Sequence, residues 1–268
     1  MPPPLRLRSA LFMPASNPRA IAKARTLACD LVILDLEDAV RDDTKEEARS
    51  AAVAAAAEGL GKPIAIRING TGTPWHAADV AAVAASAADM AVLPKVEDAA
   101  LAARIASASG KPLLAMIETP AGVLAAPAIA AAPGVAGLIA GTNDLATELR
   151  LPPGSGRGGL VLALQMIVLA ARAAGRIALD GVWNALEDPE GLAAQCAEGR
   201  ALGFDGKTLI HPGQVEIANR AFGPSDGELE DARALVAAAT GGAERFRGRM
   251  IEAMHVETAR RLLALAEG

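Results

Sequence analysis

Short apolar runs alternate with alanine-rich helical stretches along most of the chain, and this alternation limits the folds open to it. The runs expected to form strands cover residues 10–13, 31–36, 64–68, 90–93, 113–117, 135–140, 177–182 and 207–210. Helical candidates lie between them, near 18–28, 45–57, 76–87, 98–108, 121–131, 159–174, 189–202 and 213–221. Strands separated by helices predict a parallel sheet, and eight such units favour a closed (β/α)8 TIM barrel over an open, doubly wound sheet.

The strand pattern stops after residue 224. Two further helical stretches are expected near 226–239 and 249–266, with Gly241-Gly242 between them. We therefore predict a TIM-barrel catalytic domain over 1–224 and a helical extension over 225–268. The last stretch carries an apolar face that would pack on its own barrel or on a neighbouring subunit. The residues of that face are Met250, Met254, Ala259, Leu262, Leu263 and Ala266.

Composition excludes several classes of protein. The chain has 268 residues, about the length of one TIM barrel with a small addition. Its net charge is −5 without a basic tract, which argues against nucleic acid as a partner. Cys29 and Cys196 show no metal-ligand or disulfide pattern, and the N-terminus is a poor signal peptide, so a cytoplasmic location is expected. The most apolar segment, 160–171, is too short to cross a bilayer, and no membrane partner is expected.

Polar residues gather where the predicted strands end, and the active site of a TIM barrel lies at those ends. Buried charges need partners, so together these residues fit a metal, its carboxylate ligands and an anionic substrate. In strand order they are Asp35, Glu37, Asp38, Arg67, Asn69, Lys95, Glu118, Asp144, Asp180 and His211.

Several of these residues also have a purely structural interpretation. Arg67 could form a salt bridge, Lys95 could form a surface pair with Glu97, and Asp180-Gly181 could be a turn. His211 could cap the last barrel helix, and Asp35 or Asp38 could cap the second.

Glu118 and Asp144 end consecutive apolar runs, which places them side by side on one rim. Two carboxylates so placed can share one hard divalent cation. Mg²⁺ suits such a site because it takes one or two protein carboxylates and leaves its other positions to water and substrate oxygens. The pair predicts metal-assisted carbon–carbon bond chemistry on a small oxo-acid.

The sequence resembles the citrate lyase β-subunit-like family of the HpcH/HpaI aldolase superfamily. This family includes citryl-CoA, malyl-CoA and citramalyl-CoA lyases, and related thioesterases and synthases. The resemblance rests on motifs that run in order from residue 8 to about 225. They are RSALFMPA (8–15), LDLEDAV (34–40), RIN (67–69), LPKVE (93–97), IET (117–119), GTNDL (141–145), GFDGK (203–207) and IHPGQ (210–214).

The resemblance implies a TIM barrel that cleaves or forms a 3-hydroxyacyl-CoA thioester, with an acyl-CoA and a 2-oxo acid as the other side of the reaction. It implies Mg²⁺ on Glu118 and Asp144, with Arg67 as a catalytic residue that also contacts the oxo-acid. The other implied substrate-binding residues are Gly141 and Asp144, together with Phe12, Pro14, Arg19 and Lys23 toward the CoA end. Glu37, Asp38 and Lys95 would organise the metal site without binding the metal themselves.

The chain departs from the family pattern near its C-terminus. Related lyases carry an Asp in a Met-Ile-Asp-like motif that reaches a neighbouring subunit's active site, and here the matching residue is Glu252. The resemblance therefore implies Glu252 as the catalytic acid, in a homotrimer or hexamer with shared active sites. Alternatively, Glu252 is a solvated residue on the last helix.

Three other functions stay open. A class II pyruvate aldolase acting on 4-hydroxy-2-oxo acids shares the barrel and the metal pair, but it carries a His where this chain has Asp38. The chain could also be a citrate lyase subunit that works only with an acyl carrier protein, or a paralogue that binds an oxo-acid without turnover. The motifs do not distinguish cleavage, condensation and thioester hydrolysis.

Overall fold

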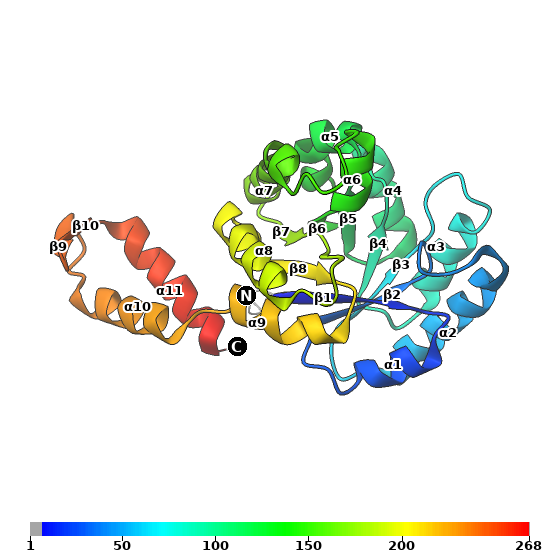
Figure 1. The fold of residues 1–268 in the computed structure, drawn as a ribbon, viewed down its shortest axis with the longest axis horizontal. Coiled ribbons are helices and arrows are strands. Elements are labelled where there is room, and N and C mark those ends of the chain that lie inside the picture. The colour runs from blue at the N-terminus through cyan, green and yellow to red at the C-terminus, as the bar shows by residue number, and fades with distance from the viewer. Residues whose placement is uncertain (1–6, 268) are drawn as a thin grey trace.

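A closed, eight-stranded parallel barrel forms the body of the molecule in a computed structural model that describes residues 7–267 (Figure 1). Each strand pairs with its neighbours in chain order, and β8 closes the barrel on β1. This confirms the predicted TIM barrel. The strands are β1 (Ser9–Pro14), β2 (Leu31–Asp35), β3 (Ile64–Arg67), β4 (Met90–Leu93), β5 (Leu113–Ile117), β6 (Val135–Ala140), β7 (Ile177–Asp180) and β8 (Gly206–Leu209).

Helices surround the barrel. All eight predicted barrel helices are present, and one further short helix, α6, follows β6. Its stretch is polar and lacks apolar periodicity, which explains why the pattern did not predict it. The helices are α1 (Pro18–Ala24), α2 (Lys45–Glu58), α3 (His76–Ala85), α4 (Ala99–Ser109), α5 (Pro120–Ala131), α6 (Thr142–Glu148), α7 (Val161–Ala173), α8 (Pro189–Leu202) and α9 (Val215–Phe222). Short 3₁₀ turns precede α2, α7 and α9 at Asp42–Thr44, Gly158–Leu160 and Pro212–Gln214.

The strands are apolar at nearly every position because both faces of the sheet are buried. In β2, Leu31 and Ile33 join the cluster inside the barrel, whereas Val32 and Leu34 pack under the helices. Leu114 and Met116 of β5 also point inward. This alternation decides which strand-end residues face the barrel mouth.

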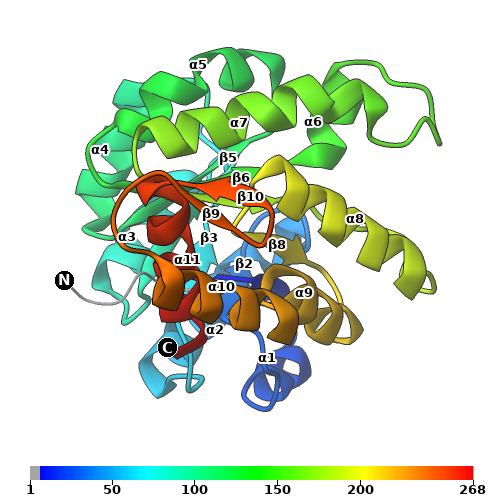
Figure 2. The ribbon, with the colours of Figure 1, turned by 90° about the vertical axis from the view of Figure 1, so that its left-hand side faces the viewer.

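The extension is a helical hairpin that projects from one end of the barrel (Figure 1), and Figure 2 shows it in front of that end. It consists of α10 (Asp226–Ala238), β9 (Glu244–Phe246), β10 (Arg249–Ile251) and α11 (Ala253–Glu267). Leu262 and Leu265 of α11 border a hollow together with Leu7 and Ile177. Leu7 and Ile177 lie where β1 and β7 begin, so the extension meets the barrel at the end opposite the strands' C-termini.

The helix expected over 249–266 is wrong at its start. Residues 249–251 pair with β9, and α11 begins at Ala253. Arg247 and Gly248 have φ angles of 46° and 81°, which make a tight hairpin turn that helical periodicity does not reveal. Met250 therefore lies on a strand and is 67% exposed, so it is not part of a packed helix face.

Between residues 7 and 267, the longest and most apolar helices fall short of what a membrane span requires.

Candidate active site

A cavity of about 290 Å³ opens at the C-terminal ends of the barrel strands. Its wall combines charged and amide side chains with apolar ones. The polar lining includes Asp35, Asp38, Arg67, Glu118, Asn143, Asp144 and Asn184, and the apolar lining includes Phe12, Met116, Val182 and Ile210.

Arg67 ends β3 and is held in one orientation. Its Nε and Nη2 donate to the two carboxylate oxygens of Asp35, each at 2.6 Å. Its guanidinium also lies 4.8 Å from the ring centre of Phe12. Since Arg67 is only 7% exposed, the bidentate ion pair and the contact with the Phe12 ring leave its side chain little conformational freedom. The salt bridge expected as the structural alternative is present, and the same side chain lines the cavity.

Asp35 holds the arginine because β2 and β3 pair in register, with Asp35 opposite Arg67. Its carboxylate also accepts the backbone N–H groups of Glu37 at 2.8 Å and Ala39 at 3.0 Å. It therefore shapes the loop after β2. The expectation that Asp35 or Asp38 caps the second helix is wrong, since Thr44 occupies that position.

Glu37 forms an ion pair with Arg67, with Oε2 at 2.7 Å from Arg67 Nη1. Asp38 Oδ2 lies 3.3 Å from the same nitrogen, Arg67 Nη1. Burial raises the pKa of Glu37 to about 8 against the attraction of Arg67, and the negative charges of Asp38 and Glu118 add to the rise. Burial thus shifts the Glu37 carboxyl group toward its neutral form.

Glu118 lies just beyond the end of β5, and it is 4% exposed. Its Oε1 accepts the backbone N–H of Lys95 at 2.7 Å. Lys95 has a φ of 51°, a left-handed backbone conformation that is unfavourable for a residue with a side chain. The residue in this conformation donates its N–H to Glu118. The lack of a side chain at Gly141 leaves room for the Glu118 side chain, because a Cβ there would lie 2.3 Å from Glu118 Cβ and 2.4 Å from Oε2.

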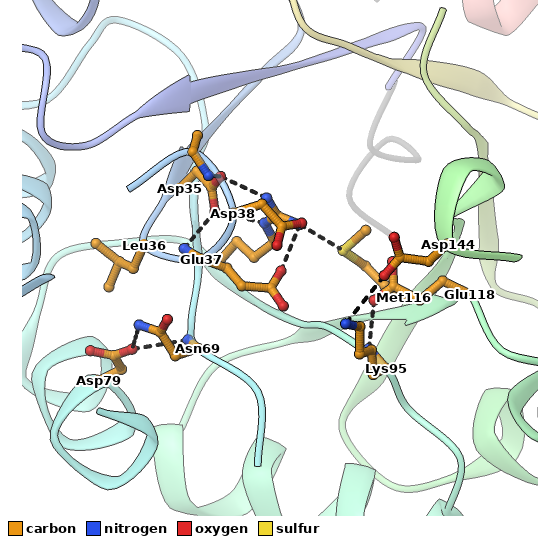
Figure 3. Close-up of polar contacts among 12 residues, drawn as sticks. Asp35, Leu36, Glu37, Asp38, Asn69, Asp79, Lys95, Met116, Glu118 and Asp144 are labelled. Carbon is orange, nitrogen blue, oxygen red and sulfur yellow. Dashed lines mark hydrogen bonds and ion pairs between the residues drawn. The ribbon is translucent and has the colours of Figure 1, made fainter. Parts of the chain in front are cut away.

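Asp144 lies in the first turn of α6 rather than on the strand itself, and Figure 3 shows it beside Glu118. Its carboxylate is 3.3 Å from Lys95 Nζ. Burial raises the pKa of Glu118 to about 7 against the Lys95 N–H, and the charge of Asp144 adds to the rise. The two acids repel each other, and a shared cation would remove that repulsion.

The donors of this site fit a magnesium ion. Among the residues that the structure describes, the cavity rim holds more carboxylates than cations: Asp35, Glu37, Asp38, Glu118 and Asp144 stand against Arg67 and Lys95. Within residues 7–267, no three or more His, Cys, Asp or Glu side chains are grouped to hold a metal. A cation between Glu118 and Asp144 would need water and substrate oxygens as its other ligands, which is how Mg²⁺ is usually bound in enzymes.

The other sequence-predicted residues lie in different places. Arg19 and Lys23 are exposed on α1, and Pro14 is half-buried at the end of β1. In the part of the chain that the structure describes, nothing beyond Ile210 lines the cavity. Glu252 lies at the turn from β10 into α11, so it does not reach the cavity of its own barrel.

Two strand-end residues have structural roles. His211 accepts the backbone N–H of Gly213 at 3.1 Å and caps the 3₁₀ turn before α9, whereas Gln214 occupies the N-cap position of the helix itself. Asp180 does not line the cavity. It is fully buried, and its carboxylate is bound by Arg157 at 2.6 Å and by Lys207 Nζ at 2.9 Å.

The fold and the site define a class: a TIM barrel with an acidic, metal-competent mouth at its strand C-termini. The chain belongs to the HpcH/HpaI aldolase/citrate lyase family, which matches residues 8–212. A second family, described as a carbon–carbon bond lyase of the TIM-barrel fold, matches residues 161–268. The predicted enzyme class, a metal-dependent carbon–carbon lyase of the citrate lyase β-subunit-like type, is thereby confirmed.

Curated relatives match over almost the whole chain. A (3S)-malyl-CoA thioesterase of Cereibacter sphaeroides is 46% identical, covering 97% of this chain and 94% of the relative. A citrate lyase subunit beta-like protein of Deinococcus radiodurans is 37% identical, covering 98% of each.

Among solved structures, the protein CitE of Mycobacterium tuberculosis in complex with magnesium, acetoacetate and coenzyme A has a TM-score of 0.84 to this chain. It is 35% identical, and the match covers 97% of this chain and 98% of that one. Another structure, the citrate lyase beta subunit of M. tuberculosis with oxaloacetate and magnesium, has a TM-score of 0.72. It is 35% identical and covers 82% of this chain and 98% of that one. Magnesium in these relatives agrees with the predicted cofactor.

Proposed function

We propose that this chain is a Mg²⁺-dependent enzyme that acts on the CoA thioester of a 3-hydroxy acid with a free carboxylate, of the malyl type. The observation that supports it most strongly is the pair of Glu118 and Asp144 beside a fixed Arg67 in one cavity. When bound by Glu118 and Asp144, Mg²⁺ would supply a Lewis acid for the substrate's carboxylate and adjacent oxygen.

The chain's own residues prepare the site for this substrate. Asp35 orients Arg67, whose guanidinium would stabilise the oxygen on which negative charge develops. The Lys95 N–H and the absence of a side chain at Gly141 hold Glu118 in place. Because these groups are fixed before substrate arrives, little reorganisation is needed during the reaction.

Carbon–carbon cleavage is the first candidate reaction. The hydroxyl group loses its proton to water, the hydroxyl-bearing carbon becomes a carbonyl, and the bond to the CH₂ beside the thioester breaks. The electron pair remains on the acyl-CoA as an enolate, which takes a proton at carbon. Malyl-CoA would give glyoxylate and acetyl-CoA. Glu252 of a neighbouring subunit is the proposed proton donor, since it lies away from its own cavity.

Hydrolysis is the second candidate, favoured by the 46% identity to (3S)-malyl-CoA thioesterase. Water would attack the thioester carbonyl and the C–S bond would break, giving malate and free CoA. Both candidates start from the same bound substrate, and they differ in which bond breaks: the carbon–carbon bond in cleavage, or the C–S bond in hydrolysis.

The CoA moiety is proposed to lie toward Phe12, Pro14 and α1. Arg19 and Lys23 are exposed there and could pair with phosphates. A pyruvate aldolase is less well supported, because Asp38 approaches Arg67 where that class has a His base.

The test is a product analysis of the purified chain with Mg²⁺ and malyl-, citramalyl- and citryl-CoA. A 2-oxo acid with no rise in free thiol indicates cleavage, and free CoA with no oxo-acid indicates hydrolysis. The carrier-protein thioester is assayed in parallel, since activity on it alone would indicate a citrate lyase subunit. No turnover of any thioester, in a sample that binds Mg²⁺, would contradict the proposal.

A further inference from the structure

A line of buried polar contacts runs behind the cavity, between the loop after β2 and helix α3. It starts at Lys45, the first residue of α2, and continues through Asn69 and Asp79 to Arg49. We propose that Lys45 is a positioning residue for the active site, acting through Glu37 and Arg67. This inference rests on the function proposed above.

Lys45 is 5% exposed, and three acceptors surround its ammonium group. Nζ donates to the backbone oxygens of Leu36 at 2.8 Å and Glu37 at 2.7 Å, and to Asn69 Oδ1 at 2.8 Å. The Trp75 ring centre lies 5.2 Å away. A buried ammonium whose three donors are all used is well suited to hold backbone in one conformation.

Asn69 and Asp79 anchor this ammonium from the other side. Asp79 Oδ2 accepts from Asn69 N at 2.9 Å and from Asn69 Nδ2 at 2.6 Å (Figure 3). Its other oxygen accepts from Arg49 Nε at 2.6 Å. Asn69 is 2% exposed and Asp79 is fully buried. Asn69 follows Arg67 by two residues, so the same contacts also fix the chain where it leaves β3.

The two carbonyls that Lys45 holds belong to Leu36 and Glu37, between Asp35 and Asp38. The carboxyl groups of Asp35, Glu37 and Asp38 all form ion pairs with Arg67. Removing Lys45 would leave buried carbonyls without partners, and the loop would rearrange to expose them to water. Glu37 and Asp38 would then move relative to Arg67, although neither residue was itself changed.

The test compares Lys45→Met with a matched control, Lys62→Met. Lys62 also donates to two backbone oxygens, those of Ala24 and Leu27, but it lies before β3 at the opposite end of the barrel. Both variants lose a lysine that bonds loop carbonyls, so both are expected to lower the melting temperature. Only Lys45→Met is expected to change the active site. Asn69→Ala serves as a second variant in case Lys45→Met does not fold, because it removes only one of the three acceptors.

The first readout needs neither substrate nor metal. The NMR signal of the Arg67 Nε–H group, assigned by its loss in Arg67→Lys, is expected to shift or broaden in Lys45→Met and Asn69→Ala and to stay unchanged in Lys62→Met. An unchanged Arg67 signal in the Lys45 and Asn69 variants would overturn the proposal. If the parent protein turns over no thioester, the proposed function fails, and this signal alone decides the positioning role.

The second readout is a double-mutant cycle on kcat. Lys45→Met is expected to lower kcat on the order of 10-fold in the parent and less than about 2-fold in a Glu37→Gln background, since residues that act through one another are not additive. Lys62→Met should leave kcat within about 2-fold in both. An equal loss in both backgrounds would show that Lys45 does not act through Glu37, and would overturn the proposal.

Discussion

Gly141 and Glu118 compete for the same space, since a Cβ at position 141 would lie 2.3 Å from Glu118 Cβ. Gly141 is not needed for an unusual backbone conformation, because its φ is −91°. Its lack of a side chain instead lets the buried carboxylate of Glu118 sit against the α6 N-terminus. The glycine of the family motif at 141–145 therefore has a steric explanation in the packing of Glu118.

Gly141→Ala is expected to displace Glu118 and weaken Mg²⁺ binding. Overpacking of this kind costs about 1–3 kcal/mol, which corresponds to roughly 5- to 150-fold in affinity if it falls on the metal site. Titration calorimetry with Mg²⁺ measures the effect. Gly158→Ala is the control, because a Cβ there would meet open space. Parent-like Mg²⁺ affinity in Gly141→Ala would mean that Glu118 is not a ligand.

Glu118→Gln and Asp144→Asn should each abolish Mg²⁺-dependent turnover and leave the fold intact. Each keeps the shape of the side chain and removes the charge that binds the metal. Loss of Mg²⁺ affinity should be on the order of 100-fold or more, the size that even outer-sphere changes can reach. Glu97→Gln, an exposed acid on the same rim, should bind Mg²⁺ as the parent does. Unchanged affinity in both site variants would exclude this pair as the metal ligands.

Arg67→Lys keeps the positive charge and loses the planar group that matches a carboxylate. We expect kcat/KM to fall roughly 100- to 1,000-fold, the range for removing a group that stabilises developing negative charge. Arg157→Lys is the matched control, because Arg157 holds buried Asp180 through two nitrogens but lies outside the cavity lining. If both variants lose stability and only Arg67→Lys loses activity, Arg67 has a catalytic role. Equal activity in parent and Arg67→Lys would make it structural.

The pKa values of Glu37 and Glu118, raised to about 8 and about 7, predict how the stability of metal-free protein depends on pH. The protonated form of such an acid is favoured in the folded state, because its folded-state pKa lies above its unfolded value. Its contribution to the free energy of unfolding is complete below about pH 4.5 and is lost as pH rises to about 8. The free energy of unfolding should therefore fall by about 2 kcal/mol or more between pH 5 and 8.5.

Glu37→Gln should flatten this decline, and saturating Mg²⁺ should reduce it by favouring ionised Glu118. Denaturant unfolding at constant ionic strength tests this, with Glu97→Gln as the control. A decline of parent size in Glu37→Gln would show that Glu37 ionises freely in the folded protein.

Hydrophobic patterning predicted the barrel because its strands are buried on both faces, and six of the eight strands start at the expected residue. Patterning failed where side chains do not decide the structure. The β9–β10 hairpin depends on the backbone angles of Arg247 and Gly248, and α6 is polar.

The site was predictable as a set of strand-end residues, but not as a set of contacts. The contact between Asp35 and Arg67 depends on the register of β2 against β3, which no single sequence shows. The role of Lys45 was missed for a similar reason: it starts a helix eight residues after Glu37, and only the fold brings its ammonium under the Glu37 carbonyl.

The geometry of the extension bears on how subunits assemble. Glu252 lies near the tip of a hairpin that meets its own barrel at the end opposite the cavity. Beside it, Met250 and Met254 are 67% and 62% exposed, an apolar surface that contact with a second subunit would cover. We therefore expect a homotrimer or hexamer in which each extension places Glu252 over a neighbour's Glu118 and Asp144.

Mixing two inactive variants tests this arrangement. Glu252→Gln subunits keep the metal site, and Asp144→Asn subunits keep the acid. After subunit exchange at equal amounts, roughly a quarter of the sites should combine an intact metal site with an intact Glu252 from the neighbour, and activity should return in that proportion. Exchange is followed independently by mass spectrometry of isotope-labelled subunits. Because either variant alone stays inactive, recovered turnover can arise only from sites shared between subunits. Complete exchange without recovery would place Glu252 outside the neighbour's chemistry, and a strictly monomeric protein with full activity would contradict the shared site altogether.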